Sequence, residues 1–159
     1  MQRLRRRAPI KVVFLDFGGV LDVSMTGHSH SGMVLNKSAV CRLNIIVEPE
    51  DVVVVVTSEL RRHKMRVELQ ELLTHNGFTG LVLDKTPYLG KPRGLEIKEW
   101  LTSTRRNVVS YAILDDGNDF NEFGCDRLVR TSYSGGGLLD EHIDKVRQVL
   151  AQPWKGSKL

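Results

Sequence analysis

The run Asp51–Val56, in which one aspartate precedes five consecutive valines, constrains the fold more than any other stretch of the chain. Valine favours extended backbone, and a strand that is apolar at every position must be covered on both faces. Such strands lie at the centre of parallel sheets, between layers of helices. The run therefore predicts a central strand of an α/β domain, ending at Thr57.

The rest of the chain alternates between apolar strands and amphipathic helices. We expect further strands at 11–15, 78–83, 108–114 and 128–131, and helices at 36–47, 61–75, 95–101 and 140–150. This alternation predicts an α/β fold with a doubly wound parallel sheet and helices on both faces, a three-layer α/β/α architecture.

The length of 159 residues suits one domain with a sizeable core. We expect a single domain over residues 11–151, with a small loop or flap at 22–35 over the end of the first strand. A basic N-terminal arm (1–10) would precede the domain and a polar tail (152–159) would follow it.

Composition indicates a soluble globular protein, because 41% of the residues are hydrophobic and 26% are charged. No apolar run approaches the ~20 residues of a membrane helix, so we expect no membrane partner. Cys41 and Cys125 lie far apart without metal-ligand spacing, which fits a reduced, cytoplasmic protein. Lys11 and Asp16 interrupt any signal-peptide core, so we expect no removable leader.

The formal net charge is +4, and much of the excess lies in the N-terminal arm, at Arg3, Arg5, Arg6 and Arg7. One interpretation is a solvated tail, and the other is an arm that binds phosphate groups or RNA.

The first predicted strand ends at a carboxylate, Asp16, which is followed by Phe17 and the pair Gly18-Gly19. Ligands of open α/β sheets gather at the carboxyl ends of the strands. Glycines allow a tight turn there and bring backbone amides close to an anion. The segment therefore indicates an anion-binding turn, although an ordinary strand-to-turn junction has the same composition.

Polar side chains also follow the later strands, with Thr57 after the valine run and Asp115-Asp116 after the strand at 108–114. A loop between them carries Lys91 and Arg93. Because the carboxyl ends of parallel strands meet at one edge of a sheet, we expect these side chains to converge with Asp16.

Three acids, a hydroxyl and a cation suit phosphoryl transfer. Asp16 is placed to attack phosphorus and form an aspartyl-phosphate. Carboxylate oxygens are ligands that Mg²⁺ prefers, and Thr57 can hydrogen-bond a phosphoryl oxygen. Lys91 or Arg93 can neutralise the charge that the nucleophile and the phosphate share.

Each of these residues also has an ordinary structural explanation. Thr57 can cap the following turn, Lys91 can be a solvated loop residue, Arg93 can pair with Glu96 or Glu99, and the acid pair can form a solvated turn. Their joint order is more specific than any single member. A receiver domain uses similar residues, but there the acid pair follows the first strand, so the order disfavours a receiver.

Four segments of the chain resemble the four motifs of the haloacid dehalogenase (HAD) superfamily. They are FLDFGGVLD, VVVVVTS, the segment with Lys91 and Arg93, and YAILDDGND. The chain is most similar to the HAD domain of Swiss-Army-Knife RNA repair proteins, on the segments TSELR, DKTP, RGLEIKEWL and Gly137-Leu138. The resemblance runs from residue 11 to about residue 150.

This resemblance implies a Rossmann-like core with little or no cap domain, a Mg²⁺ cofactor, and hydrolysis of phosphate esters through an aspartyl-phosphate. The implied roles are Asp16 as nucleophile, Thr57 or Ser58 as the phosphate-binding hydroxyl, Lys91 or Arg93 as the cation, and Asp16, Asp115, Asp116 and the Gly18 carbonyl as metal ligands.

Gly18 departs from the family pattern, which has an aspartate there as general acid and base. Loss of such a group typically costs about 10²- to 10⁴-fold in rate. We therefore expect a slow or atypical phosphohydrolase, and we expect Gly18→Asp to raise its activity. Asp22, His28 and His30 are possible substitutes, although we expect exposed flap positions for them.

Two functions follow. The first is a Mg²⁺-dependent phosphohydrolase that acts on a phosphorylated small molecule or nucleic-acid end, with an open site because the chain has no room for a large cap. The alternative is a catalytically silent domain that binds phosphate, nucleic-acid ends such as those of RNA, or a protein partner.

Overall fold

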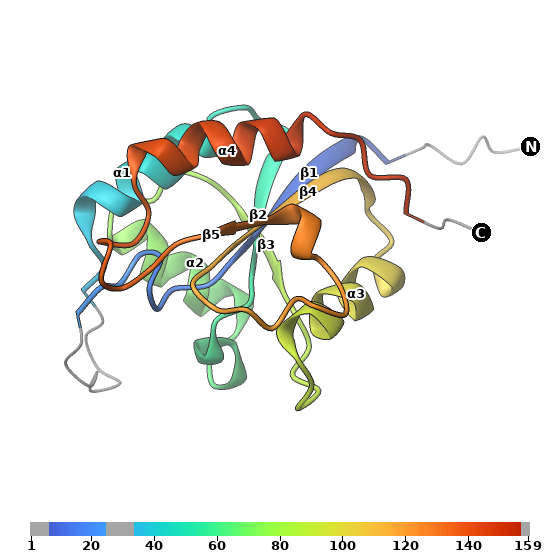
Figure 1. Ribbon diagram of the computed structural model, residues 1–159, viewed down its shortest axis with the longest axis horizontal. Helices are drawn as coiled ribbons and strands as arrows, with labels where there is room; N and C mark the ends of the chain where they lie inside the picture. The colour runs from blue at the N-terminus through green and yellow to red at the C-terminus, as the bar shows by residue number, and fades with distance from the viewer. Residues whose placement is uncertain (1–6, 25–33, 157–159) are drawn as a thin grey trace, which may run out of the picture.

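The computed structural model describes residues 7–24 and 34–156, which form one five-stranded parallel sheet (Figure 1). The strand order is β3-β2-β1-β4-β5. The strands are β1 (Pro9–Leu15), β2 (Val52–Val56), β3 (Val82–Lys85), β4 (Asn107–Asp115) and β5 (Leu128–Arg130).

Helices cover both faces of the sheet. They are α1 (Lys37–Ile46), α2 (Arg66–His75), α3 (Arg93–Ser103) and α4 (Asp140–Leu150), together with the 3₁₀ turns η1 (Glu59–Arg62) and η2 (Cys125–Arg127). Apolar residues of α1, α2 and α4 share a core on one face, and those of α3 lie in a second core on the other face. The three-layer, Rossmann-like α/β fold that the sequence predicts is therefore confirmed.

The five valines of β2 are all buried, as the sequence predicts for a central strand. Val52, Val54 and Val56 belong to the core beneath α1, α2 and α4, whereas Val53 and Val55 face α3. This alternation follows from the period of two in a strand, which sends successive side chains to opposite faces. Strand β2 therefore lies fully buried between the two layers of helices.

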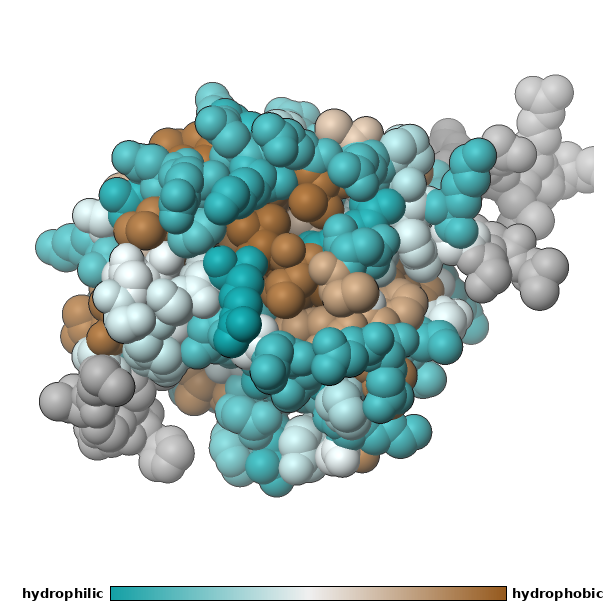
Figure 2. Space-filling view, viewed as in Figure 1, coloured by the Kyte–Doolittle hydropathy of each residue, from teal (hydrophilic) through white to brown (hydrophobic). Residues whose placement is uncertain are grey.

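Strand β5 ends the sheet. On the face drawn in Figure 2, hydrophobic residues gather around β5, while hydrophilic residues cover α4 beside it. The strand is only three residues long and ends at the exposed Arg130. Short length and an exposed charge are features that protect a sheet edge from pairing with another chain.

The helix expected at 61–75 is divided into η1 and α2. The buried Arg61 guanidinium donates hydrogen bonds to the carbonyls of Thr57 (2.6 Å) and Thr86 (3.1 Å), which holds η1 against the sheet. Helix α2 then begins after Met65, whose amide donates to the Glu68 carboxylate at 2.6 Å. A tertiary contact of Arg61 therefore interrupts a helix that local periodicity predicts as continuous.

The strand expected at 78–83 begins only at Val82, and it includes the polar Asp84. The indole nitrogen of Trp100 donates to the Asp84 carboxylate at 2.8 Å, so that this acid is satisfied inside the fold. Phe78 is buried before the strand begins. The polar residues in β3 hide the strand from a search for apolar runs.

Both predicted end segments contribute to the domain. Strand β1 begins at Pro9, inside the range predicted as the arm. Trp154, in the range predicted as a polar tail, packs edge-on against Tyr111 at 5.4 Å between ring centroids, and its amide donates to the Val109 carbonyl. The range predicted as a polar tail thus contributes one aromatic contact to the domain. In the part of the chain that the structure describes, no helix is long and apolar enough to cross a membrane.

Candidate active site

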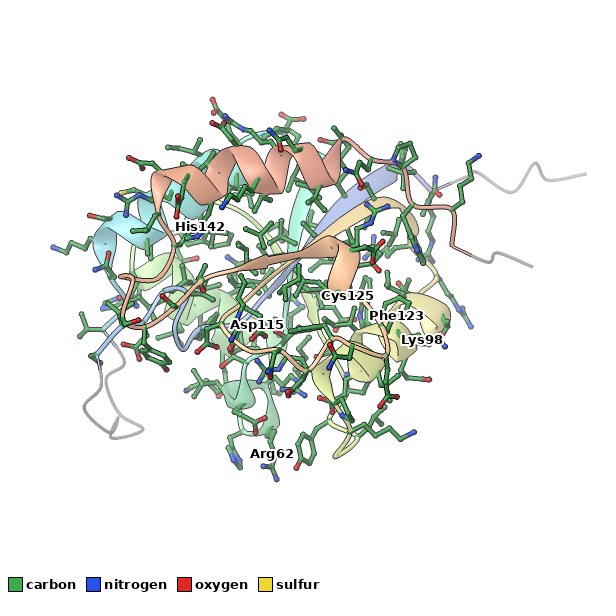
Figure 3. All side chains as sticks on the ribbon, viewed as in Figure 1. Arg62, Lys98, Asp115, Phe123, Cys125 and His142 are labelled. Atoms are coloured by element: carbon green, nitrogen blue, oxygen red, sulfur yellow. The ribbon has the colours of Figure 1, made fainter. Side chains whose placement is uncertain are left out.

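The carboxyl ends of β1, β2 and β4 bring the predicted acids and hydroxyls to one edge of the sheet. Leu15 pairs with Val56 on one side and with Leu114 on the other, so the residues that follow these positions lie at the same level. They are Asp16, Thr57 and Asp115. Figure 3 labels Asp115 at this edge and Arg62 of η1 farther out, at the rim of the molecule.

Arg93, the first residue of α3, joins two of these carboxylates. Its Nη1 lies 2.8 Å from Oδ2 of Asp16 and 2.7 Å from Oδ2 of Asp115. Lys91, two residues earlier, is exposed. Of the two cations that the sequence leaves open, the structure therefore brings Arg93 to the acids. The alternative pairing of Arg93 with Glu96 is wrong, because Glu96 binds Arg61.

Asp16, Asp115 and Asp116 form an acidic cluster that could bind a metal ion. Each offers one carboxylate oxygen, and these oxygens all lie within 4.8 Å of one another. When the three acids are ionised they carry three negative charges, and Arg93 contributes one positive charge through its contacts with two of them. This donor set and its charge fit a divalent cation with oxygen ligands, such as Mg²⁺.

The pKa values of the cluster reflect its burial and the charges around it. Burial raises the pKa of Asp16 to about 7; Arg93 opposes this shift and Asp115 adds to it. Burial, and then Asp115, raise the pKa of Asp116. Burial alone would lower the pKa of Arg93, but Asp16 and Asp115 outweigh it and raise the pKa. Burial is thus the main reason that Asp16 and Asp116 resist ionisation, and the neighbouring charges modify its effect.

Thr57 and Ser58 both follow β2, and their hydroxyls differ. The Thr57 hydroxyl is buried and finds no hydrogen-bond partner in the described ranges. An unsatisfied buried polar atom costs about 1–3 kcal/mol. Ser58 lines the cavity, and its hydroxyl accepts a hydrogen bond from the Leu60 amide at the start of η1. Capping of the turn thus falls to Ser58, which leaves the Thr57 hydroxyl available for a ligand.

A cavity of about 500 Å³ lies over the acidic cluster. Its lining includes Asp16, Phe17, Gly18, Asp22, Ser58, Glu59, Leu60, His63, Arg93, Asp116 and Tyr133. The expectation of an exposed flap position is wrong for Asp22, which is 2% exposed and accepts hydrogen bonds from the amide and hydroxyl of Ser24. His28 and His30 lie outside the described residues.

The turn at Gly18-Gly19 is closely packed on both sides. Gly19 has a positive φ of 71°, and a Cβ there would lie 2.5 Å from Oδ2 of Asp116. At Gly18, a Cβ would overlap the hydroxyl of Tyr133. The space that an aspartate at position 18 needs is therefore occupied. The gain in activity that we expect from Gly18→Asp must be revised, because the substitution first has to displace Tyr133.

Arg61 supports the site from beneath and is a residue to which sequence reasoning assigned no role. Its Nη2 lies 2.7 Å from Oε1 of Glu96, and both side chains are almost fully buried. The guanidinium also binds the carbonyls of Thr57 and Ser58. Arg61 thereby joins the loop after β2 to α3, the helix that carries Arg93. The sequence signal for this role is the arginine of the TSELR segment, which closely follows the strand-ending Thr-Ser pair.

Tyr133 is the second functional candidate that sequence reasoning missed. It lies in the loop between β5 and α4. Burial raises the pKa of Tyr133, and the carboxylates of Asp116, Asp22 and Asp16 raise it further. The hydroxyl is therefore protonated at neutral pH, and it faces the cavity as a hydrogen-bond donor. A lone aromatic residue in a Gly-Ser loop was the available signal.

Comparison with known proteins identifies the family of the chain. The model of the family described as the HAD domain in Swiss Army Knife RNA repair proteins matches residues 12–143. The chain belongs to this family. Searches of curated proteins and of solved structures gave no match. Membership in the HAD family indicates a HAD-like phosphohydrolase or a related function, and HAD domains typically use Mg²⁺.

Proposed function

We propose that this HAD domain is a Mg²⁺-dependent phosphohydrolase that cleaves phosphate monoesters through an aspartyl-phosphate at Asp16. The observation that carries the proposal is the double contact of Arg93 with Asp16 and Asp115 at the base of the cavity. It places a fixed cation between the proposed nucleophile and the acid that ends β4.

Asp16 is held in an orientation that suits attack on phosphorus. Its Oδ1 accepts a hydrogen bond from the Phe17 amide at 2.8 Å, and its Oδ2 contacts Arg93. The backbone bond fixes the carboxylate, while the guanidinium reduces its repulsion with an incoming phosphate. In the proposed reaction an Asp16 oxygen bonds to phosphorus as the ester oxygen leaves, and water then cleaves the aspartyl-phosphate.

The buried hydroxyl of Thr57 supplies a donor for a phosphoryl oxygen. Within the described residues it has no protein partner, which is the expected state of a group that acquires one only when substrate binds. Arg61 holds the Thr57 backbone in place, so that little reorganisation is needed on binding.

Asp16, Asp115, Asp116 and the Gly18 carbonyl are the groups that we propose to hold Mg²⁺. The bound ion supplies charge neutralisation between the carboxylates and the phosphate oxygens. Because burial raises the pKa of Asp16 to about 7, a cation bound at the cluster would also favour its ionised form at neutral pH.

Gly18 limits the rate in this proposal. Without a side chain at this position, the leaving oxygen receives no carboxyl group from the turn after β1. We therefore expect faster turnover of esters with stable leaving groups, such as 4-nitrophenyl phosphate, than of alkyl phosphates.

The decisive experiment measures hydrolysis of 4-nitrophenyl phosphate by the full chain with and without Mg²⁺. We expect turnover that requires Mg²⁺ and that Asp16→Asn abolishes. Asp144→Asn, which removes an exposed carboxylate on α4, is the matched control and should retain full activity. Turnover that survives Asp16→Asn would refute the role of Asp16 as nucleophile.

A second candidate is a catalytically silent domain that binds phosphate groups or nucleic-acid ends, and Gly18 is the observation in its favour. This function predicts no turnover across a broad panel of phosphate esters, together with measurable binding of Mg²⁺ or phosphate. An RNA partner would show as binding that weakens steeply with salt and that deletion of residues 1–7 reduces.

A further inference from the structure

The loop between β5 and α4 is attached to the Gly18-Gly19 turn at two points. The Thr131 hydroxyl donates to the Gly19 carbonyl at 2.6 Å, and the Leu138 amide donates to the Val20 carbonyl at 2.9 Å. Tyr133 lies between these two attachments. Its position over the turn is therefore set by hydrogen bonds on either side of it.

Within the loop, further bonds restrict the backbone on either side of the tyrosine. The Gly137 amide donates to the Ser132 carbonyl at 2.8 Å, and the Gly135 amide donates to the Ser132 hydroxyl at 2.9 Å. The Gly136 amide donates to the carbonyl of Tyr133 itself at 3.2 Å. The segment is thus a closed turn that presents its one aromatic side chain.

The side chain of Tyr133 can contact a substrate bound in the cavity. It lines the cavity together with Asp16 and is 38% exposed, so that its ring lies between the protein interior and solvent. Its hydroxyl would clash with a Cβ at Gly18, the residue two places after the proposed nucleophile. The phenol therefore extends into the space beside Gly18 that a side chain at this position would enter.

We propose that Tyr133 is a further catalytic residue, whose hydroxyl donates a hydrogen bond to the leaving oxygen of the phosphate ester. This inference rests on the proposed phosphohydrolase function. When Asp16 bonds to phosphorus, the phosphorus–oxygen ester bond breaks and its electron pair stays on the leaving oxygen. A neutral donor beside Gly18 stabilises that charge. Solvent supplies the proton that the leaving oxygen takes up and accepts the one that the attacking water loses, so Tyr133 ends the cycle unchanged.

The test compares two aryl esters of similar size, 4-nitrophenyl phosphate and phenyl phosphate. The nitrophenolate ion is a stable leaving group and needs little help, whereas the phenolate ion needs more. We expect Tyr133→Phe to lower kcat/KM about 10- to 100-fold for phenyl phosphate, as loss of a hydrogen bond to a charged group predicts. For 4-nitrophenyl phosphate we expect less than about a threefold loss. Tyr88→Phe, an exposed tyrosine outside the cavity lining, is the matched control.

A second measurement tests the geometry. A methyl group at Gly18 would overlap the Tyr133 hydroxyl but would lie 3.5 Å from Cζ, an ordinary contact. Gly18→Ala should therefore lower the melting temperature of the wild-type protein and lower it less in the Tyr133→Phe background. It should also reduce turnover of phenyl phosphate, and adding Tyr133→Phe should cause little further loss, because both changes remove the same hydrogen bond.

The outcomes separate the two proposals. Asp16-dependent turnover with equal effects of Tyr133→Phe on both esters, or with fully additive effects of the two substitutions, overturns the role of Tyr133 and leaves the proposed function standing. Absence of Asp16-dependent turnover of either ester overturns both.

Discussion

The acidic cluster predicts that the metal-free protein becomes less stable as the pH rises, and that Asp16→Asn removes much of this dependence. Burial raises the pKa of Asp16 from 3.8 to about 7 in the folded protein. Folding therefore favours the protonated acid, so stability is greatest below the unfolded pKa and falls as pH rises towards the folded pKa.

The size of the effect follows from the pKa difference. Each unit of pKa corresponds to about 1.4 kcal/mol, so the whole titration costs about 4 kcal/mol of unfolding free energy. About 2 kcal/mol of this falls between pH 5 and pH 7. Asparagine at position 16 keeps an oxygen for the Phe17 amide but cannot ionise.

The assay is chemical denaturation of both proteins in the presence of a chelator, at a series of pH values. The quantity that matters is the stability of Asp16→Asn minus that of the wild type, which should rise by about 2 kcal/mol from pH 5 to pH 7. The subtraction removes the contribution of His142 to the pH dependence. Burial lowers the pKa of His142, so this residue makes the protein more stable as the pH rises, opposite to Asp16. A flat difference, or one that falls with pH, would refute the account of the cluster.

Three further predictions concern the groups around Asp16. Mg²⁺ should raise the melting temperature of the wild type, and Asp115→Asn should abolish this shift. The exposed control Asp126→Asn should show the wild-type shift. Equal shifts in all three proteins would argue against a metal at the cluster. Thr57→Val should leave the free energy of unfolding unchanged or raise it by about 1 kcal/mol, since the hydroxyl has no partner in the described structure. The same substitution should weaken inhibition of turnover by inorganic phosphate. Unaltered inhibition would exclude Thr57 as a phosphate ligand. Arg61→Met should lower the free energy of unfolding by about 3–5 kcal/mol, measured by chemical denaturation, because it leaves the buried Glu96 without its ion-pair partner. Arg62→Met, at an exposed position, should cost about 0.5 kcal/mol or less. A similar cost for both substitutions would contradict a structural role for the Arg61–Glu96 pair.

Several residues of the candidate site could be placed from the sequence because they depend on local patterns. The burial of β2 follows from its valines, and the alternation of strands with helices makes the sheet parallel. Once the sheet is parallel, a residue that follows a strand lies at the carboxyl edge. Asp16, Thr57 and Asp115 could therefore be assigned to one site without knowledge of any contact.

Contacts between distant segments could not be read in this way. The choice of Arg93 over Lys91 depends on how α3 starts relative to β1 and β4. The burial of Arg61 depends on its ion pair with Glu96, 35 residues away. The contacts of Arg61 also interrupt the helix that periodicity predicts over 61–75. In each case the partner lies on another element, and local propensity carries no information about it.

By itself, then, the sequence determined the α/β class, the edge of the sheet that bears the acids, and the absence of a side chain at Gly18. Only the tertiary structure decided what fills the space beside Gly18. Thr131 and Gly19, which lie 112 residues apart, are joined by a hydrogen bond that places the loop of Tyr133 over the turn. Periodicity predicts which way a side chain points from its own strand or helix, but it carries no information about contacts between distant loops. Only the folded chain brings the Tyr133 loop and the Gly18-Gly19 turn together.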